Sequence, residues 1–152
     1  MVKNLANFQK RIGINFYNQK LLTKCFTHKS YNPLENNEKL EFLGDRVLGL
    51  IISQNLLKFF PNDKEGDLDK KLASLVNKKQ CAIIAKDLSL QEYILIKNSN
   101  NKTNIESKVL SDCLESVIGC IYLDQGLEVA EKFIIKNWRK YLNKSLITER
   151  DS

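Results

Sequence analysis

The sequence predicts an all-α fold, and three observations support this prediction. Apolar residues recur at helical spacing along most of the 152 residues. Residues 38–60 are apolar around most of a helix circumference, which is typical of a helix at the centre of a bundle. No pair of alternating segments suggests strands, and the length suits one domain with a hydrophobic core. We therefore expect a helical bundle around one long central helix.

The individual elements follow from apolar spacing and from the residues that begin and end helices. Asn18 is placed to cap the second helix, and Asn36 or Asn37 to cap the central one. Pro61 ends the central helix because its ring disfavours a helical residue before it, and Gly126 suits a left-handed cap. We expect helices at residues 5–12, 19–26, 37–60, 65–79, 80–88, 106–123 and 127–142, a short extended or helical piece at 93–96, a mobile polar loop at 98–104 and a frayed tail at 146–152.

Charge and cysteine content narrow the class of protein. A formal net charge of +6 favours an anionic partner, and nucleic acid is the first candidate, although many soluble proteins carry a similar surplus. Cys25, Cys81, Cys113 and Cys120 form no C-x-x-C pair, and a single histidine accompanies them, which argues against zinc. Their apolar neighbours are typical of buried free thiols in a reduced, cytoplasmic setting. We expect no secretory signal and no membrane span.

Five acidic residues form the most informative pattern. At about 100° per residue, Glu38, Glu41 and Asp45 fall on one stripe of the central helix. Asp112 and Glu115 repeat the spacing of three in another apolar segment. A charged stripe is usually a solvated helix face, but these acids stand among apolar residues, where unpaired carboxylates are costly. We therefore expect both segments to contribute to one site that binds a divalent metal.

The expected counter-charge is a cation from outside the chain, because Lys39 and Arg46 are predicted to point away from the acidic stripe. Ligands that are all carboxylates suit Mg²⁺, with Mn²⁺ able to substitute. Such a metal on a basic protein suggests hydrolysis of phosphodiesters. A calcium loop at 63–74 is rejected, since Leu68 replaces the required glycine and Ser74 the required glutamate.

Three further residues have simpler interpretations. His28, the single histidine, is interpreted as a structural residue at a helix end rather than as a general base. Gly44 and Gly49 lie inside the central helical pattern, where glycine costs about 1 kcal/mol in helix propensity. We expect both glycines to permit close helix packing.

Residues 38–45, which read EKLEFLGD, closely resemble the signature of the ribonuclease III family. The departures are mild, with Lys39 where arginine is usual and Arg46 where a small residue is common. The resemblance covers residues 5–142. The other matching blocks, in the family's order, are T-H-K-S at 27–30, F-P at 60–61, E-G-D-L at 65–68, E-S at 106–107, L-S-D at 110–112, L-E-S-V-I-G at 114–119 and Y-L-D-Q-G at 122–126.

The resemblance implies the all-helical ribonuclease III endonuclease domain, at residues 1–145, and cleavage of double-stranded RNA in RNA processing. Matched by position, the metal-binding carboxylates would be Glu41, Asp45, Asp112 and Glu115, with Asp45 and Glu115 catalytic and Glu115 the key ligand. Glu38 and Glu65 match acidic positions with a supporting role near the cleft and the subunit interface. All of these acids are present, which argues against an inactive relative.

The resemblance also implies a homodimer and its products. Phe42 matches an aromatic residue that inserts into a socket on the other subunit, although ordinary core packing is an equal interpretation from sequence. Two sites at a fixed separation would each cut one strand, leaving 5′-phosphate and 3′-hydroxyl ends with two-nucleotide 3′ overhangs. No membrane and no small-molecule cofactor are expected.

One departure is large, because the family's double-stranded-RNA-binding domain is not found before the chain ends at Ser152. We expect weak, salt-sensitive binding with little sequence preference as a result. An alternative is a non-catalytic scaffold that binds double-stranded RNA with the nuclease fold. A second alternative is a compact enzyme of ribosomal RNA maturation, although such enzymes usually read differently from EKLEFLGD.

Overall fold

The computed structural model describes residues 4–97 and 104–151, which form seven α-helices and a 3₁₀ turn. No strand lies in these two ranges, and one isolated bridge joins Thr27 to Leu95. The prediction of an all-α fold is confirmed. The loop predicted at 98–104 lies outside the described residues except for its last position. The elements are α1 (Leu5–Ile12), α2 (Gln19–Cys25), α3 (Glu38–Phe59), α4 (Glu65–Val76), α5 (Lys78–Asp87), η1 (Leu90–Glu92), α6 (Ser107–Gln125) and α7 (Leu127–Asp151).

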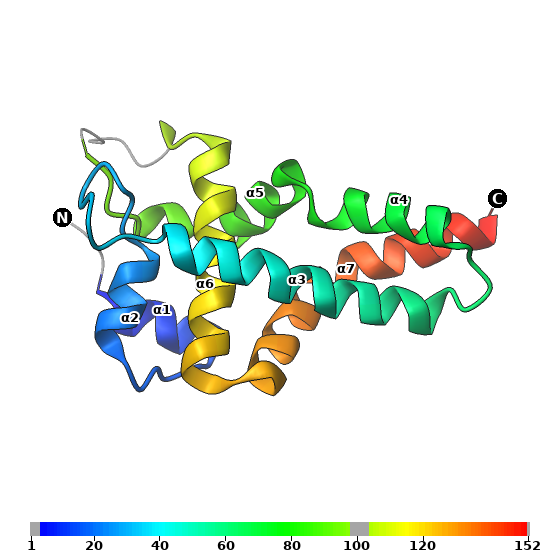
Figure 1. The fold of residues 1–152 in the computed structure, drawn as a ribbon, viewed down its shortest axis with the longest axis horizontal. Helices are drawn as coiled ribbons and strands as arrows, with labels where there is room; N and C mark the ends of the chain where they lie inside the picture. The colour runs from blue at the N-terminus through cyan, green and yellow to red at the C-terminus, as the bar shows by residue number, and fades with distance from the viewer. Residues whose placement is uncertain (1–3, 98–103, 152) are drawn as a thin grey trace.

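The long helix α3 is central, as predicted, and its largest interface is with α6. Figure 1 shows α6 crossing the first half of α3, while α4 returns alongside the second half. The helix α7 begins beyond the end of α6 and extends toward the far end of the α3–α4 pair (Figure 1). The α3–α6 crossing therefore lies toward one end of the molecule's long axis, and the turn between α3 and α4 lies at the other end.

Two glycines let the backbones of α3 and α6 touch at their crossing. A Cβ atom added to Gly44 would lie 1.6 Å from the Glu115 carbonyl oxygen, and one added to Gly119 would lie 2.2 Å from the Leu40 carbonyl oxygen. Gly44 therefore has the packing role predicted for it. The same prediction for Gly49 is wrong, because a Cβ there would meet no atom within 4 Å.

Buried aromatic side chains fill much of the hydrophobic core. The ring of Phe8 packs edge-on against Phe26 and Tyr93, with centroids 5.0 and 5.4 Å apart. Trp138 on α7 is fully buried, and its indole N–H donates to the Leu75 carbonyl at 2.7 Å. All four cysteines are free and buried, as their apolar neighbours predicted.

Several predicted boundaries shift. The cap at Asn18 is confirmed, since its side chain accepts a hydrogen bond from the Leu21 N–H at 2.9 Å. The helix predicted at 65–79 instead ends at Val76, because extended Asn77 interrupts it and caps a new helix. Gly126 has a positive φ of 94° but an extended ψ of 175°, so the predicted left-handed cap is wrong. The last helix continues to Asp151, through most of the predicted frayed tail.

Among the described residues, the longest helices contain too many charges and too little apolar sequence to cross a membrane.

Candidate metal centre at the crossing of α3 and α6

The contact between α3 and α6 gathers acidic side chains from both helices. Glu41 and Asp45 lie one turn before and one residue after Gly44, and Gly44 packs on the backbone of Glu115. Carboxylate oxygens of Glu41, Asp112 and Glu115 lie within 4.8 Å of one another, and Asp45 hydrogen-bonds to Glu115. We call these four residues the acidic cluster. Segments separated by about seventy positions thus meet in space, as the acidic pattern predicted.

Burial distinguishes Glu115 from the other members of the acidic cluster. Its side chain is 4 % exposed, whereas those of Glu41 and Asp112 are 26 % and 14 % exposed. A buried carboxylate is costly unless a cation or hydrogen-bond donors compensate it. Glu115 therefore depends most on whatever positive charge occupies the acidic cluster.

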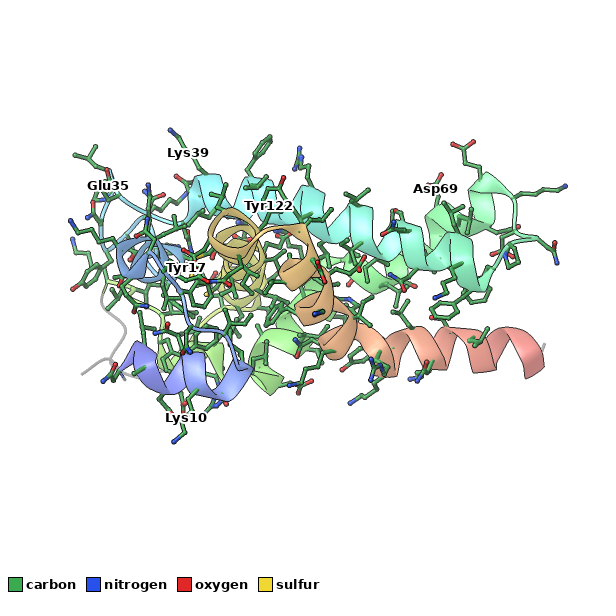
Figure 2. All side chains as sticks on the ribbon, turned by 90° about the horizontal axis from the view of Figure 1, so that it is seen from below. Lys10, Tyr17, Glu35, Lys39, Asp69 and Tyr122 are labelled. Atoms are coloured by element: carbon green, nitrogen blue, oxygen red, sulfur yellow. The ribbon has the colours of Figure 1, made fainter. Side chains whose placement is uncertain are left out.

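Two predicted supporting acids lie outside the acidic cluster. Glu38 is exposed on the first turn of α3, with its carboxylate 3.9 Å from the Lys29 ammonium. Glu65 begins α4, next to the far end of α3 (Figure 1). Figure 2 labels Lys39 near the start of α3 and Asp69 in the second turn of α4, and they lie far apart along the long axis. Within one chain, Glu65 is therefore remote from the acidic cluster.

Phe42 on α3 is 62 % exposed, which excludes its interpretation as a core residue. The Arg46 guanidinium lies over its ring, 4.1 Å from the centroid. Leu50 and Leu57, on the same side of α3 by helical spacing, are 55 % and 61 % exposed. The role of Phe42 at a subunit interface stays a prediction.

Lys78 of α5 enters the acidic cluster and supplies counter-charge from within the chain, which was not predicted from the sequence. Its ammonium lies 2.5 Å from Asp112, 3.0 Å from Glu115 and 3.7 Å from Glu41. Lys108 adds a contact of 2.8 Å to Asp112. Sequence reasoning missed Lys78 because no acidic residue lies near it in the chain.

Arg46 also departs from its predicted orientation. Its guanidinium lies 3.0 Å from the carboxylate of Asp45 instead of pointing away from the acidic stripe. Both side chains are about half exposed, so this ion pair contributes little to stability. It nevertheless places a third positive side chain beside the acidic cluster, after Lys78 and Lys108.

A local signal in the sequence could have drawn attention to Lys78. Asn77 caps α5 by accepting from the Gln80 N–H at 2.8 Å, so Lys78 and Lys79 occupy the first two positions of that helix. Cations are unfavourable at a helix N-terminus, where the backbone dipole presents positive charge. Two lysines in this place suggest that at least one of them has a separate electrostatic role.

The pKa values in the metal-free protein follow from burial and from the lysines. Burial first, and then the hydrogen bond that protonated Glu115 donates to Asp45, raise the pKa of Glu115 to about 8. Burial and the neighbouring Asp112 raise the pKa of Glu41. Burial alone would raise the pKa of Asp112, but hydrogen bonds from Lys108 and Lys78 lower it overall. Burial opposes the charge on Lys78, yet its bonds to Asp112 and Glu115 raise its pKa.

We expect the metal-free protein to lose stability as the pH rises from about 5 to about 8. The folded state keeps a proton on Glu115 up to a pKa of about 8, whereas the unfolded chain releases it near 4.5. The folded state therefore binds more protons in this window, and the free energy of unfolding falls by at most about 1.4 kcal/mol per pH unit. Urea unfolding at pH 5.5 and at pH 7.5, in the presence of a metal chelator, measures this difference in the free energy of unfolding. Glu115→Gln should flatten the slope, and an unchanged slope in this variant would contradict the assignment.

His28 has the structural role predicted for it. Its Nδ1 accepts from the Ser30 N–H at 3.1 Å and lies 2.8 Å from the Ser30 hydroxyl, while its own backbone N–H donates to Leu95. Burial, followed by the charge of Lys29, lowers the pKa of the imidazole. These contacts fix the loop that connects α2 to α3.

The donor set of the acidic cluster fits a hard divalent cation. Three carboxylate oxygens from two helices converge within 4.8 Å, and no thiolate or imidazole belongs to this group among the described residues. Mg²⁺ and Mn²⁺ bind through such oxygen ligands. The positive charge of Lys78 at the same place shows that the fold itself positions a cation there.

A family model described as Ribonuclease-III-like matches residues 18–142, which include every helix from α2 to most of α7. The chain belongs to the ribonuclease III family. Its helices form the ribonuclease III nuclease domain, and the family is metal-dependent, in agreement with the carboxylate donor set.

Curated relatives support this membership over the whole chain. Ribonuclease 3 of Pelagibacter ubique is 51 % identical over 100 % of this chain and 69 % of its own length. Ribonuclease 3 of Nitratiruptor is 43 % identical over 89 % of this chain and 61 % of its own length. The chain therefore spans about two thirds of these ribonuclease III proteins.

Solved structures of the family have the same fold. The nuclease domain of ribonuclease III from Campylobacter jejuni superposes with a TM-score of 0.86 at 40 % identity, covering 90 % of this chain and 97 % of that domain. That structure was described for flexibility in a region involved in dimer formation of its nuclease domain. Dicer from Pichia stipitis shares the fold, with a TM-score of 0.67 at 24 % identity.

Proposed function

We propose that this chain hydrolyses phosphodiester bonds of double-stranded RNA with a divalent metal held by the acidic cluster. The observation that carries the proposal is that carboxylate oxygens of Glu41, Asp112 and Glu115 lie within 4.8 Å of one another, with Asp45 hydrogen-bonded to Glu115 in the metal-free protein. Family membership supplies the reaction class. We propose Mg²⁺ as the resident metal, with Mn²⁺ able to replace it, because all the donors are oxygens.

Each residue of the acidic cluster has a distinct proposed role. Glu115 is the most buried, so its carboxylate would be the most fixed ligand, and the neighbouring Asp45 would act as a further ligand once Glu115 has lost its proton. Glu41 and Asp112 are more exposed and would complete the ligand set from the solvent side. A bound divalent cation supplies Lewis acidity, which lowers the pKa of a coordinated water and takes up charge on the leaving oxygen.

In the proposed reaction, water attacks the scissile phosphorus and the bond from phosphorus to the 3′ oxygen breaks. The 3′ oxygen takes a proton, so the products carry a 5′-phosphate and a 3′-hydroxyl. The exposed Lys108 ammonium, 73 % exposed beside Asp112, is placed to attract the backbone of the RNA to the acidic cluster. A net charge of +6 favours the same partner.

We also propose that two copies pair through the outer face of α3. Phe42, Leu50 and Leu57 form an exposed apolar stripe along this helix, and such stripes are typical of subunit interfaces. A symmetric pair would place two acidic clusters at a fixed separation, one for each strand of the duplex. Glu65, remote from its own cluster, would keep its supporting role only in such a pair. Four buried free cysteines suit a reduced compartment, and we propose the cytoplasm.

Cleavage of labelled RNA tests the proposal. We expect the protein to cut duplex RNA in Mg²⁺, to leave single-stranded RNA of the same sequence intact, and to stop in EDTA. End analysis should find 5′-phosphates, 3′-hydroxyls and two-nucleotide 3′ overhangs. Binding of the duplex without cleavage in either Mg²⁺ or Mn²⁺ would instead favour a non-catalytic scaffold.

A further inference from the structure

One lysine occupies the centre of the acidic cluster. The Lys78 ammonium contacts Asp112 at 2.5 Å, Glu115 at 3.0 Å and Glu41 at 3.7 Å, and these same three carboxylates have oxygens within 4.8 Å of one another. A single small cation bound by all three carboxylates would lie within contact distance of the ammonium. The proposed metal and Lys78 therefore compete for one position.

We propose that Lys78 is a built-in counter-ion that holds the metal position in the metal-free protein and must leave when the metal binds. This inference rests on the proposed metal-dependent function. Lys78 would then set the metal concentration at which the nuclease becomes active, because its departure opposes metal binding.

The position of Lys78 in the fold suits a group that can leave. Its side chain is 56 % exposed, so the ammonium can reach water by rotation of the flexible stem, without movement of α5. Glu115 is 4 % exposed and lies on the helix that contacts Gly44, so it cannot follow the ammonium outward.

Without Lys78, the buried carboxylates lack their central compensating charge. Asp112 keeps its contact with Lys108 at 2.8 Å, but among the described residues Glu115 and Glu41 each have their ammonium contact with Lys78. Once Glu115 is ionised, carboxylates that no ammonium compensates attract an incoming cation more strongly. When a site is competent in only a fraction of molecules, its apparent affinity falls by that fraction. Removal of Lys78 should therefore raise metal affinity.

Calorimetric titration of Mn²⁺ into the wild type, Lys78→Met and Lys79→Met tests this proposal without measuring activity. Methionine keeps an unbranched side chain and removes the charge, and exposed Lys79 is the next residue along α5. We expect Lys78→Met to bind Mn²⁺ on the order of tenfold more tightly than the wild type, if Lys78 occupies the metal position in about nine tenths of the metal-free molecules. Lys79→Met should bind like the wild type. Equal or weaker binding by Lys78→Met would overturn the proposal.

A measurement on the unmodified protein covers the case in which Lys78→Met fails to fold. The ¹⁵N NMR signal of the Lys78 ammonium should be protected from exchange without metal and should lose this protection as Mg²⁺ saturates the site. A signal that is unchanged at saturation would overturn the proposal. If neither the wild type nor any variant bound Mn²⁺ or Mg²⁺ at millimolar concentration, the proposed function itself would fail, which distinguishes the two ideas.

Discussion

Replacement of Glu115 by glutamine should lower the rate of duplex RNA cleavage on the order of 10³-fold. The substitution keeps the size of the side chain but removes the charge of the most buried carboxylate in the acidic cluster. A metal ion contributes several kcal/mol to transition-state stabilisation, and about 4 kcal/mol corresponds to a factor of 10³. Single-turnover cleavage of a labelled duplex in saturating Mg²⁺ measures the effect.

The matched control for this prediction is Glu128→Gln. Glu128 lies in the first turn of α7 and is 84 % exposed, where it forms an ion pair of 3.7 Å with Lys132. Such exposed pairs contribute little, so cleavage by this variant should equal that of the wild type. If Glu115→Gln cleaved within about tenfold of Glu128→Gln, the ligand role of Glu115 would be wrong.

The second large effect is expected for Gly44→Ala, which should lower the free energy of unfolding by about 3 kcal/mol or more. The new methyl group would lie 1.6 Å from the Glu115 carbonyl oxygen and 2.9 Å from the Gly119 nitrogen. Both obstacles are backbone atoms, so no change of rotamer relieves the overlap and the helices must separate. Overpacking usually lowers the free energy of unfolding by about 1–3 kcal/mol, and we expect Gly44→Ala to reach or exceed the upper end of this range.

Gly49→Ala, five residues further along α3, is the control for Gly44→Ala. A methyl group there meets no atom within 4 Å, and alanine has a better helix propensity than glycine. The free energy of unfolding should therefore rise by up to about 1 kcal/mol. Urea unfolding of both variants measures the contrast, and a similar change in the two would refute the close contact at Gly44.

Most of the fold could be predicted from apolar spacing and from helix-ending residues. Proline after α3 and Asn18 before α2 act through local chemistry that a sequence displays directly. The break between α4 and α5 was predicted two to three residues too late, because residues 65–88 keep an apolar helical spacing on both sides of Asn77. Gly44 and Gly49 are indistinguishable in sequence, and only the course of α6 decides which one packs.

The sequence predicted the convergence of the carboxylates in the acidic cluster, but it did not predict the lysine that lies among them. Carboxylates among apolar residues on two helices are costly unless they meet around positive charge, so their convergence followed from energetics. The source of that charge did not follow, because the reach of Lys78 across from α5 is a property of three-dimensional packing. The family resemblance pointed to the acids and gave no indication of this lysine.

The glycine contact between α3 and α6 has a consequence for how the enzyme loses activity. Since Gly44 lies against the Glu115 backbone, the carboxylates cannot part unless the two central helices also part. Separation of the carboxylates of the acidic cluster therefore requires the same cooperative transition that unfolds the whole domain. Heat inactivation should then coincide with global denaturation, and amide protons flanking this contact should be among the last to exchange with deuterium.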